Sequence, residues 1–165
     1  MLRRACIPLI LLALAGCGDG EAASSRARPD AAQVLRVVDG DTVLVQLGGR
    51  RERVRYIGVD TPESVRPGAR VQCFAKRASA FNERLVAGER VRLVADAEHR
   101  DRHGRLLAYV YRVRDGLFVN AELVRRGYAR TLTIPPNVAK AKELRRLAAD
   151  ARRNGRGLWS SCPAS

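Results

Sequence analysis

Short apolar segments separated by tight turns dominate the first half of the chain. Residues 34–38 and 42–47 are rich in β-branched side chains, and the Asp-Gly-Asp between them is typical of a hairpin turn. Polar and apolar residues alternate over 51–59, as they do in a strand that buries one face. Asp-Thr-Pro at 60–62 ends this strand, because proline cannot continue a β-ladder. The pattern predicts three consecutive strands.

A helical spacing begins after the polar loop that follows. Between residues 74 and 86 the apolar side chains recur at steps of three and four, which predicts a helix, and Gly88 is positioned to end it. Two further strands are expected over 89–95 and 106–113, joined by a charged loop at 96–105.

The last part of the chain is predicted to be helical. Residues 119–126 indicate a short helix that Gly127 ends, and Asn137 is expected to cap a final helix whose apolar stripe begins at Val138. We interpret Trp159 as a plug in the core near the C-terminus, with a base-stacking platform as the alternative. Three strands, a helix, two strands and further helices form the order of an OB-type barrel. We therefore expect a mainly β fold with added helices (α+β), an OB-fold with a five-stranded barrel and about three helices.

The first 32 residues do not follow this pattern. Two arginines precede an apolar run at 5–15 that is too short to span a bilayer and ends in small residues. Leu-Ala-Gly-Cys at 14–17 resembles the bacterial lipobox, and that resemblance implies cleavage before a lipidated Cys17. Residues 1–16 are then a lipoprotein signal peptide, 17–32 a flexible tether and 33–165 the folded domain. Ordinary secretion, with Cys17 a chance feature, is the alternative.

Composition and charge narrow the class of partner. A hydrophobic content of 46% allows a real core and excludes wholesale disorder. The chain has 31 Lys and Arg against 17 Asp and Glu, a net charge of +14 and an isoelectric point near 11.0. This excess favours a polyanion, either nucleic acid or an anionic membrane surface. Most of the basic residues are arginines, which suit bidentate phosphate recognition, although a biased genome composition would give the same excess.

Two cysteines, Cys73 and Cys162, remain in the folded domain. In a chain bound for an oxidising compartment, the expected use is one disulfide between them. A metal site is the weaker alternative, because no CxxC or histidine spacing accompanies them. Two free thiols are the third possibility.

Acidic residues are scarce, and four of them stand at predicted strand ends. Asp39 and Asp41 flank a turn, while Asp60 and Glu63 follow the strand that ends at Val59. If those strands are neighbours, the carboxylates converge at one end of the barrel. With a backbone carbonyl they would form a hard oxygen site suited to Ca²⁺. Taken singly, each also has an ordinary explanation as a turn former, a strand terminator or a solvated surface residue.

Five motifs follow one another along the domain. They are Val-Asp-Gly-Asp-Thr at 38–42, Val-Arg-Tyr-Ile-Gly-Val-Asp-Thr-Pro-Glu at 54–63, Asp-Arg-His-Gly-Arg-Leu-Leu-Ala-Tyr-Val-Tyr at 101–111, Val-Asn-Ala-Glu-Leu-Val-Arg-Arg-Gly at 119–127 and Gly-Leu-Trp-Ser at 157–160. In this order they resemble the staphylococcal nuclease family, from about residue 33 to residue 160. Each motif is weak alone, and their order makes the signal specific.

The resemblance implies a calcium site. Asp41 and Asp60 would bind Ca²⁺ through their carboxylates, and Thr61 through its backbone carbonyl. Asp39 would lie beside the metal and add negative potential without a direct bond.

The resemblance also implies a reaction. Arg55 and Arg105 would hold the scissile phosphate, and Glu63 would act on the attacking water as general base or as its positioner. Two guanidinium forks and a cation aimed at the non-bridging oxygens stabilise the charge of the transition state. The expected substrates are single-stranded DNA, duplex DNA and RNA, and the expected products carry 3′-phosphate and 5′-hydroxyl ends.

Contacts to the nucleotide match the family least well. His103, Tyr109 and Thr133 are expected near it, but the family's type member has aromatic residues at the positions of His103 and Thr133. Stacking is impossible at Thr133, so we expect weaker nucleotide affinity. His103 could stack, donate to a terminal phosphate when protonated, or be only solvated.

Three functions compete at this point. The first is an active nuclease, which the combination of acidic residues and arginines favours. The second is a non-cleaving OB-fold module that captures extracellular nucleic acid, and the third is a basic envelope lipoprotein. In each case we expect an exported monomer that faces the periplasm or the cell exterior and contacts the membrane only through its lipid anchor.

Overall fold

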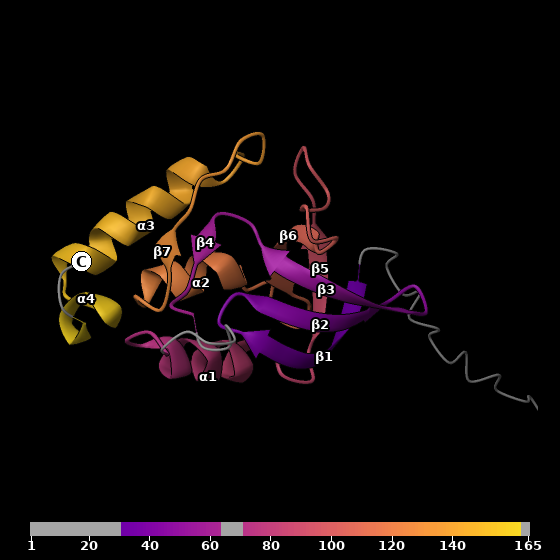
Figure 1. Ribbon diagram of the computed structural model, residues 1–165, viewed down its shortest axis with the longest axis horizontal. Coiled ribbons are helices and arrows are strands. Elements are labelled where there is room, and N and C mark those ends of the chain that lie inside the picture. The colour runs from indigo at the N-terminus through magenta and orange to yellow at the C-terminus, as the bar shows by residue number, and fades with distance from the viewer. Residues whose placement is uncertain (1–30, 64–70, 163–165) are drawn as a thin grey trace, which may run out of the picture.

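The computed structural model describes residues 31–63 and 71–162 (Figure 1). The predicted signal peptide, the lipidation site Cys17 and nearly all of the predicted tether lie outside the described residues. The folded region begins slightly earlier than expected, because Ala31 and Ala32 already pair with Arg92 and Val91 of a neighbouring strand. No helix in the described part of the chain is long and apolar enough to cross a membrane.

Five strands close into a barrel in the order β1-β2-β3-β6-β5. Their bounds are β1 Ala31–Asp39, β2 Thr42–Leu47, β3 Arg50–Tyr56, β5 Arg90–Val94 and β6 Leu106–Arg112. Only β3 and β6 pair in parallel. Buried valines fill the interior, among them Val43, Val45 and Val54, because β-branched side chains pack well on a pleated surface. The predicted five-stranded α+β barrel is confirmed.

The strand predicted over 51–59 is interrupted. β3 ends at Tyr56, and a separate short strand, β4 (Val59–Asp60), pairs with β7 (Arg130–Thr131) outside the barrel. The break is at Gly58, whose φ of 79° favours glycine. A Cβ there would meet the Leu144 side chain at 2.5 Å. Alternation of residue types could not reveal this turn, because it depends on a helix far away in the sequence.

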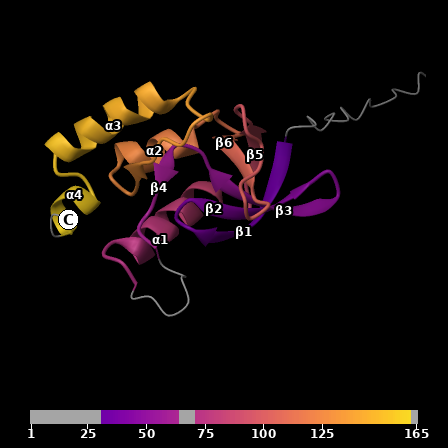
Figure 2. The same ribbon diagram turned by 45° about the horizontal axis from the view of Figure 1, so that its top comes forward.

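The described part of the chain has four helices, and they lie outside the barrel (Figures 1 and 2). They are α1 Ala75–Val86, α2 Val119–Arg125, α3 Ala141–Arg153 and the single turn α4 Leu158–Ser161. α1 packs on β1, α2 on β6, and α3 on α2. Figure 2 shows α3 as the outermost element, on the side of α2 that faces away from the strands.

The prediction that Asn137 caps the last helix is wrong. Its side-chain amide accepts a hydrogen bond from the Glu98 N–H at 2.7 Å and donates one to the Glu98 carbonyl at 2.9 Å. The helix begins later, at Ala141, with Lys140 at its N-cap position. An asparagine amide can pair with one backbone donor and one backbone acceptor at once, and here it joins two loops.

The predicted disulfide between Cys73 and Cys162 is confirmed, with sulfur atoms 2.10 Å apart. It connects the residues just before α1 to the end of α4, across 89 positions of sequence. The chain end is therefore bonded covalently to the segment that leads into the first helix.

Candidate active site

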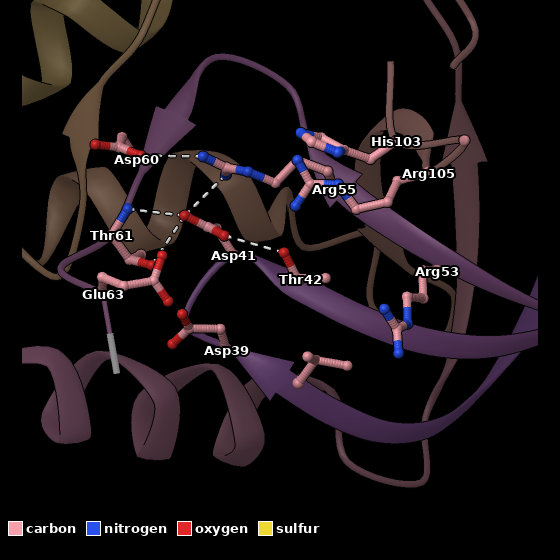
Figure 3. Close-up of a pocket in the computed structure, with 12 residues that line it drawn as sticks. Asp39, Asp41, Thr42, Arg53, Arg55, Asp60, Thr61, Glu63, His103 and Arg105 are labelled. Carbon is pink, nitrogen blue, oxygen red and sulfur yellow. Dashed lines mark hydrogen bonds and ion pairs between the residues drawn. The ribbon is translucent and has the colours of Figure 1, made fainter. Parts of the chain in front are cut away.

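An open cavity of about 660 Å³ lies at one end of the barrel (Figure 3). It is bounded by the β1-β2 turn, β3, the residues after β4 and the loop before β6. Its lining residues are Val38, Asp39, Asp41, Thr42, Arg53, Arg55, Asp60, Thr61, Glu63, His103, Gly104 and Arg105. All the residues that were predicted to bind metal or to act in catalysis, together with Asp39 and His103, thus line one space.

Asp41 lies at the centre of the hydrogen bonding in this cavity. One carboxylate oxygen accepts hydrogen bonds from the Thr61 N–H and hydroxyl at 2.8 and 2.9 Å, and the other accepts one from the Thr42 hydroxyl at 3.2 Å. Burial raises the pKa of the Asp41 carboxyl above its ordinary value, and Asp39 adds to this, although Arg55 and Thr61 counteract it. The carboxylate is held in place but is easier to protonate than a free aspartate.

A glycine brings the Asp41 turn next to Thr61. A Cβ on Gly40 would come within 2.7 Å of the Thr61 hydroxyl oxygen, which real side chains do not allow. Only glycine therefore lets the β1-β2 turn approach β4 closely enough for Asp41 to reach Thr61.

The Arg55 guanidinium bridges the two predicted metal ligands. It is 2.8 Å from the Asp41 carboxylate and 3.0 Å from that of Asp60, and it also donates to the Val59 carbonyl at 2.9 Å. The Asp60 side chain is 54% exposed, so this pair opens towards solvent. The positive charge between them allows both carboxylates to stay close together.

The donor atoms of the site fit a hard cation in type. The Asp41 and Asp60 carboxylates and the Thr61 carbonyl are all oxygen ligands, which is what Ca²⁺ prefers. Within the described residues no group of three or more His, Cys, Asp or Glu side chains forms a ready metal cage. The protein therefore offers a partial set of ligands, and water or substrate oxygens would complete the coordination.

Helix α1 orients Asp39. The Ser79 hydroxyl and the Gly40 N–H donate to its carboxylate at 2.8 Å each, and the Asn82 amide donates to its backbone carbonyl at 3.1 Å. The Asp39 carboxylate is thus held at the edge of the cavity beside Asp41 (Figure 3). Sequence reasoning missed Ser79 and Asn82, because nothing near them in the sequence connects α1 to the turn.

Glu63 is held through its backbone. Its N–H donates to the Gln72 side-chain oxygen at 2.9 Å, and its carbonyl accepts from the Gln72 N–H at 3.1 Å. Gln72 directly precedes Cys73 of the disulfide. The carboxylate points towards Asp39 and Asp41 (Figure 3). Gln72 is a second supporting residue that the sequence did not reveal.

Asp101 organises the loop that carries Arg105. It accepts hydrogen bonds from the Arg105 side chain at 2.7 Å and from the N–H groups of Arg105 and His103 at 3.0 and 2.9 Å. Partial burial opposes the charge of Asp101, but these hydrogen bonds outweigh it and lower its pKa below the ordinary value. The His103 ring accepts a hydrogen bond from the Arg102 side chain at 3.2 Å.

A second pocket of about 500 Å³ adjoins the first and shares Arg55, His103 and Arg105 with it. Its apolar side chains are Ile57, Val59, Leu107, Leu132 and Ile134. Leu132 and Ile134 are 39% and 58% exposed. Sequence reasoning missed this groove, because only the β4-β7 pairing brings residues 132–134 next to the barrel.

Two of the predicted nucleotide contacts do not line either pocket. Tyr109 is only 2% exposed, and its hydroxyl donates to Asp96 at 2.8 Å and accepts from the Lys140 N–H at 3.2 Å. Thr133 is exposed, but it lies between the two lining residues without lining the groove itself. Of the predicted contacts, His103 alone lies at the site.

Trp159 is not a plug in the core. It is partly buried, with the guanidinium carbons of Arg130 and Arg152 at 5.2 and 5.7 Å from the centre of its ring. This is a cation–π arrangement near the surface.

Comparison with known proteins decides the family. The family model described as "Staphylococcal nuclease homologue" matches residues 53–161. The chain belongs to the staphylococcal nuclease family. As a member of this family it is a nuclease, a hydrolase, by homology, and its substrate is nucleic acid. The staphylococcal nuclease family is generally calcium-dependent.

Individual relatives of this nuclease homologue cover most of its length. A thermonuclease of Staphylococcus intermedius is 38% identical over 159 residues, which are 96% of this chain and 94% of the relative. A thermonuclease of Staphylococcus hyicus is 36% identical over 137 residues, 83% and 80% of the two chains. Endonuclease YncB of Bacillus subtilis is 38% identical over 127 residues, 76% of this chain and 59% of the relative.

Proposed function

We propose that this protein is a calcium-dependent phosphodiesterase that cleaves DNA and RNA and leaves 3′-phosphate and 5′-hydroxyl ends. The observation that carries the proposal is the joint position of Arg55, Arg105, Glu63 and the Asp41–Asp60 carboxylate pair around one open cavity. Hydrolysis of a phosphodiester needs positive charge at the non-bridging oxygens and a group that acts on water. The cavity contains both.

Arg55 and Arg105 supply the positive charge from the protein itself. Each guanidinium is already oriented, Arg55 by Asp41 and Asp60 and Arg105 by Asp101. Donors that are fixed before the reaction lose little free energy in reorganising as the transition-state charge develops. Bidentate contacts from two directions would also hold the phosphate in line with the attacking water.

Glu63 is the group for the water. It is the carboxylate after β4, and its backbone is fixed by Gln72 while its side chain points into the cavity. It would accept a proton from the attacking water or hold that water in position.

Asp41, Asp60 and the Thr61 carbonyl would hold the calcium ion. When bound, the ion supplies a Lewis acid that neutralises charge on the phosphate oxygens. The same carboxylates form ion pairs with Arg55, so cation binding would compete with these pairs. This competition would free the guanidinium for the substrate.

The groove beside the cavity suits the nucleoside next to the scissile phosphate. Leu132, Ile134 and Leu107 offer aliphatic surface, and the aromatic side chains beside it are His103 and the almost fully buried Tyr56. Aliphatic contacts are insensitive to the hydrogen-bonding edges of a base, which supports cleavage with little sequence preference. Such contacts are also weaker than stacking, which costs on the order of 1–3 kcal/mol per base when it is lost.

The disulfide indicates that the domain matures in an oxidising compartment and is exported. We further propose that Cys17 is lipidated and anchors the protein to a membrane, with residues up to about 30 as the tether. The folded domain would then contact the membrane only through this anchor, and work as a monomer at the cell exterior or in the periplasm.

The test is digestion of single-stranded DNA, duplex DNA and RNA by the purified protein, with added Ca²⁺ or with EGTA. Cleavage that requires Ca²⁺ and leaves 3′-phosphate ends supports the proposal. Salt-sensitive binding without cleavage would favour the nucleic-acid capture module instead. If the protein neither cleaved nor bound nucleic acid, the nuclease and the capture module would both be contradicted, and the envelope lipoprotein would remain.

A further inference from the structure

A third arginine lines the catalytic cavity without a role so far. Arg53 lies on β3 two residues before Arg55, and it pairs with Leu44 where Arg55 pairs with Thr42. Side chains two apart on a strand point to the same face, so both guanidinium groups lie on the cavity side of β3. Figure 3 shows Arg53 across the cavity from Asp60.

Arg53 differs from the other two arginines in having no partner among residues 31–63 and 71–162. Arg55 is paired with Asp41 and Asp60, and Arg105 with Asp101. Within the described residues no hydrogen bond or ion pair reaches the Arg53 guanidinium, and the residue is exposed. An unpaired cation at the rim of a cavity for a polyanion is available to bind it without first breaking an ion pair.

The spacing fits a second phosphate of the same strand. Two residues along an antiparallel strand advance the chain by about 7 Å, which is on the scale of one nucleotide repeat in an extended strand. A phosphate held by Arg55 therefore places its neighbour within reach of Arg53. The apolar groove opens on the other side of Arg55, beside Ile57 and Val59, so the nucleoside in the groove and the phosphate at Arg53 would lie on opposite sides of the scissile bond.

The charge of the cavity favours a cation at this position. Four carboxylates line the cavity, those of Asp39, Asp41, Asp60 and Glu63. They repel any phosphate that is not itself held by a cation. A cation at the rim offsets this repulsion for the phosphate next to the scissile one.

We infer that Arg53 binds the phosphate adjacent to the scissile phosphate, on the side away from the apolar groove, and so favours substrates with more than one phosphodiester. The inference rests on the proposed nuclease function. It concerns binding of the substrate, not the chemical step.

The test compares a dinucleoside monophosphate with oligonucleotides that carry one additional phosphate at either end. For Arg53→Ala, the loss in kcat/KM on one of the two extended substrates should exceed the loss on the dinucleoside monophosphate by about tenfold, as expected for one charge-assisted hydrogen bond. The other extended substrate should behave like the dinucleoside. Arg53→Lys, which keeps the charge, should lie between Arg53→Ala and the parent protein.

Arg146→Ala is the matched control. It removes the same charge from an exposed position on α3 that lines neither pocket, and the substrates should keep their relative kcat/KM values. An equal effect of Arg53→Ala on all three substrates, or none, would overturn the inference while leaving the nuclease intact.

Binding gives a readout that is independent of turnover. The measurement is the slope of log Kd against log salt concentration for a single-stranded oligonucleotide in EGTA, where no cleavage is expected. For Arg53→Ala this slope should be smaller than for the parent protein by about 0.7, because one phosphate contact contributes that amount. An unchanged slope would also overturn the inference. If the parent protein cut no substrate but this slope still changed, the proposed activity would fail and the phosphate contact would stand.

Discussion

Asp41 joins three parts of the site at the level of single residues. Through Thr61 it contacts the residue after β4, through Arg55 it contacts β3, and it belongs itself to the β1-β2 turn. Its raised pKa means that folding favours the protonated form. The ionised carboxylate therefore costs stability as the pH rises through its pKa, and a proton competes with calcium as the pH falls through it.

This competition predicts a pH-dependent calcium requirement. As the pH is lowered, the calcium concentration needed for half-maximal activity should rise. This rise should begin at a higher pH than the ordinary aspartate pKa of 3.8 would give. Asp41→Asn should raise that concentration at neutral pH by about tenfold or more, because it removes a charged ligand. Glu83→Gln, an exposed charge change on α1 outside both pockets, is the control. A calcium titration of Asp41→Asn that matches the parent would exclude Asp41 from the metal site.

Arg105 tests whether geometry or charge matters at the phosphate. Arg105→Lys keeps the positive charge but loses both the planar fork and the bond from its Nε to Asp101. We expect kcat to fall on the order of 10²-fold, with an unchanged thermal melting curve because the side chain is partly exposed. Arg125→Lys, on the exposed side of α2, is the matched control. Parental turnover by Arg105→Lys would show that only charge is needed there.

At the level of elements, the segment between β4 and α1 depends on the disulfide. Gln72 holds the backbone of Glu63, and the next residue, Cys73, is bonded to Cys162 after α4. The end of the chain thus supports the base of the segment that carries the Glu63 carboxylate. Neither Cys73 nor Cys162 lines the main cavity, so any effect on catalysis is indirect. It can pass through Gln72 to Glu63, or through Asp60 and Thr61, which line a smaller pocket with both cysteines.

Breaking this bond should therefore affect both stability and turnover. The double variant Cys73→Ser, Cys162→Ser should lose up to about 4 kcal/mol of unfolding free energy, as loop closure over this length implies. It should also show a lower kcat, because Gln72, which holds the Glu63 backbone, directly precedes Cys73. Denaturant unfolding and steady-state kinetics with and without reducing agent measure both. Reducing agent should lower the stability and the kcat of the parent protein and should leave both unchanged in the double variant. If reducing agent left the parent protein unchanged as well, the prediction would be contradicted.

At the level of the whole molecule, the sequence predicted those features of the fold and site that follow from the order of residues within one segment. Alternation and β-branched runs predicted the barrel, and ordered motifs predicted which side chains meet at its end. The interruption at Gly58, the role of Asn137 between two loops and the groove at Leu132 and Ile134 were missed. Each of these depends on contacts between residues far apart in the sequence, for which a single chain carries no periodic signal.

The attachment of the whole protein to a membrane has two possible physical causes, and one variant separates them. The proposed lipid on Cys17 would hold the chain through buried acyl groups, whereas the net charge of +14 could hold it electrostatically to anionic lipid. Only the second is screened by salt. Cys17→Ser should therefore release the protein from membranes into the soluble fraction at physiological salt, with unchanged nuclease activity per molecule, because the folded domain begins near Ala31.

Fractionation at low and high salt is the measurement. The parent protein should stay with the membranes in high salt and leave them only in detergent, as expected for several acyl chains on one residue. If the parent protein were washed off the membranes by salt alone, the basic surface would be the anchor. In that case the surface that binds nucleic acid would also face the membrane, and anionic vesicles should inhibit cleavage in competition with DNA. A lipid on a tether of more than ten residues predicts the opposite, because it leaves the cavity free for its substrate while the protein remains attached.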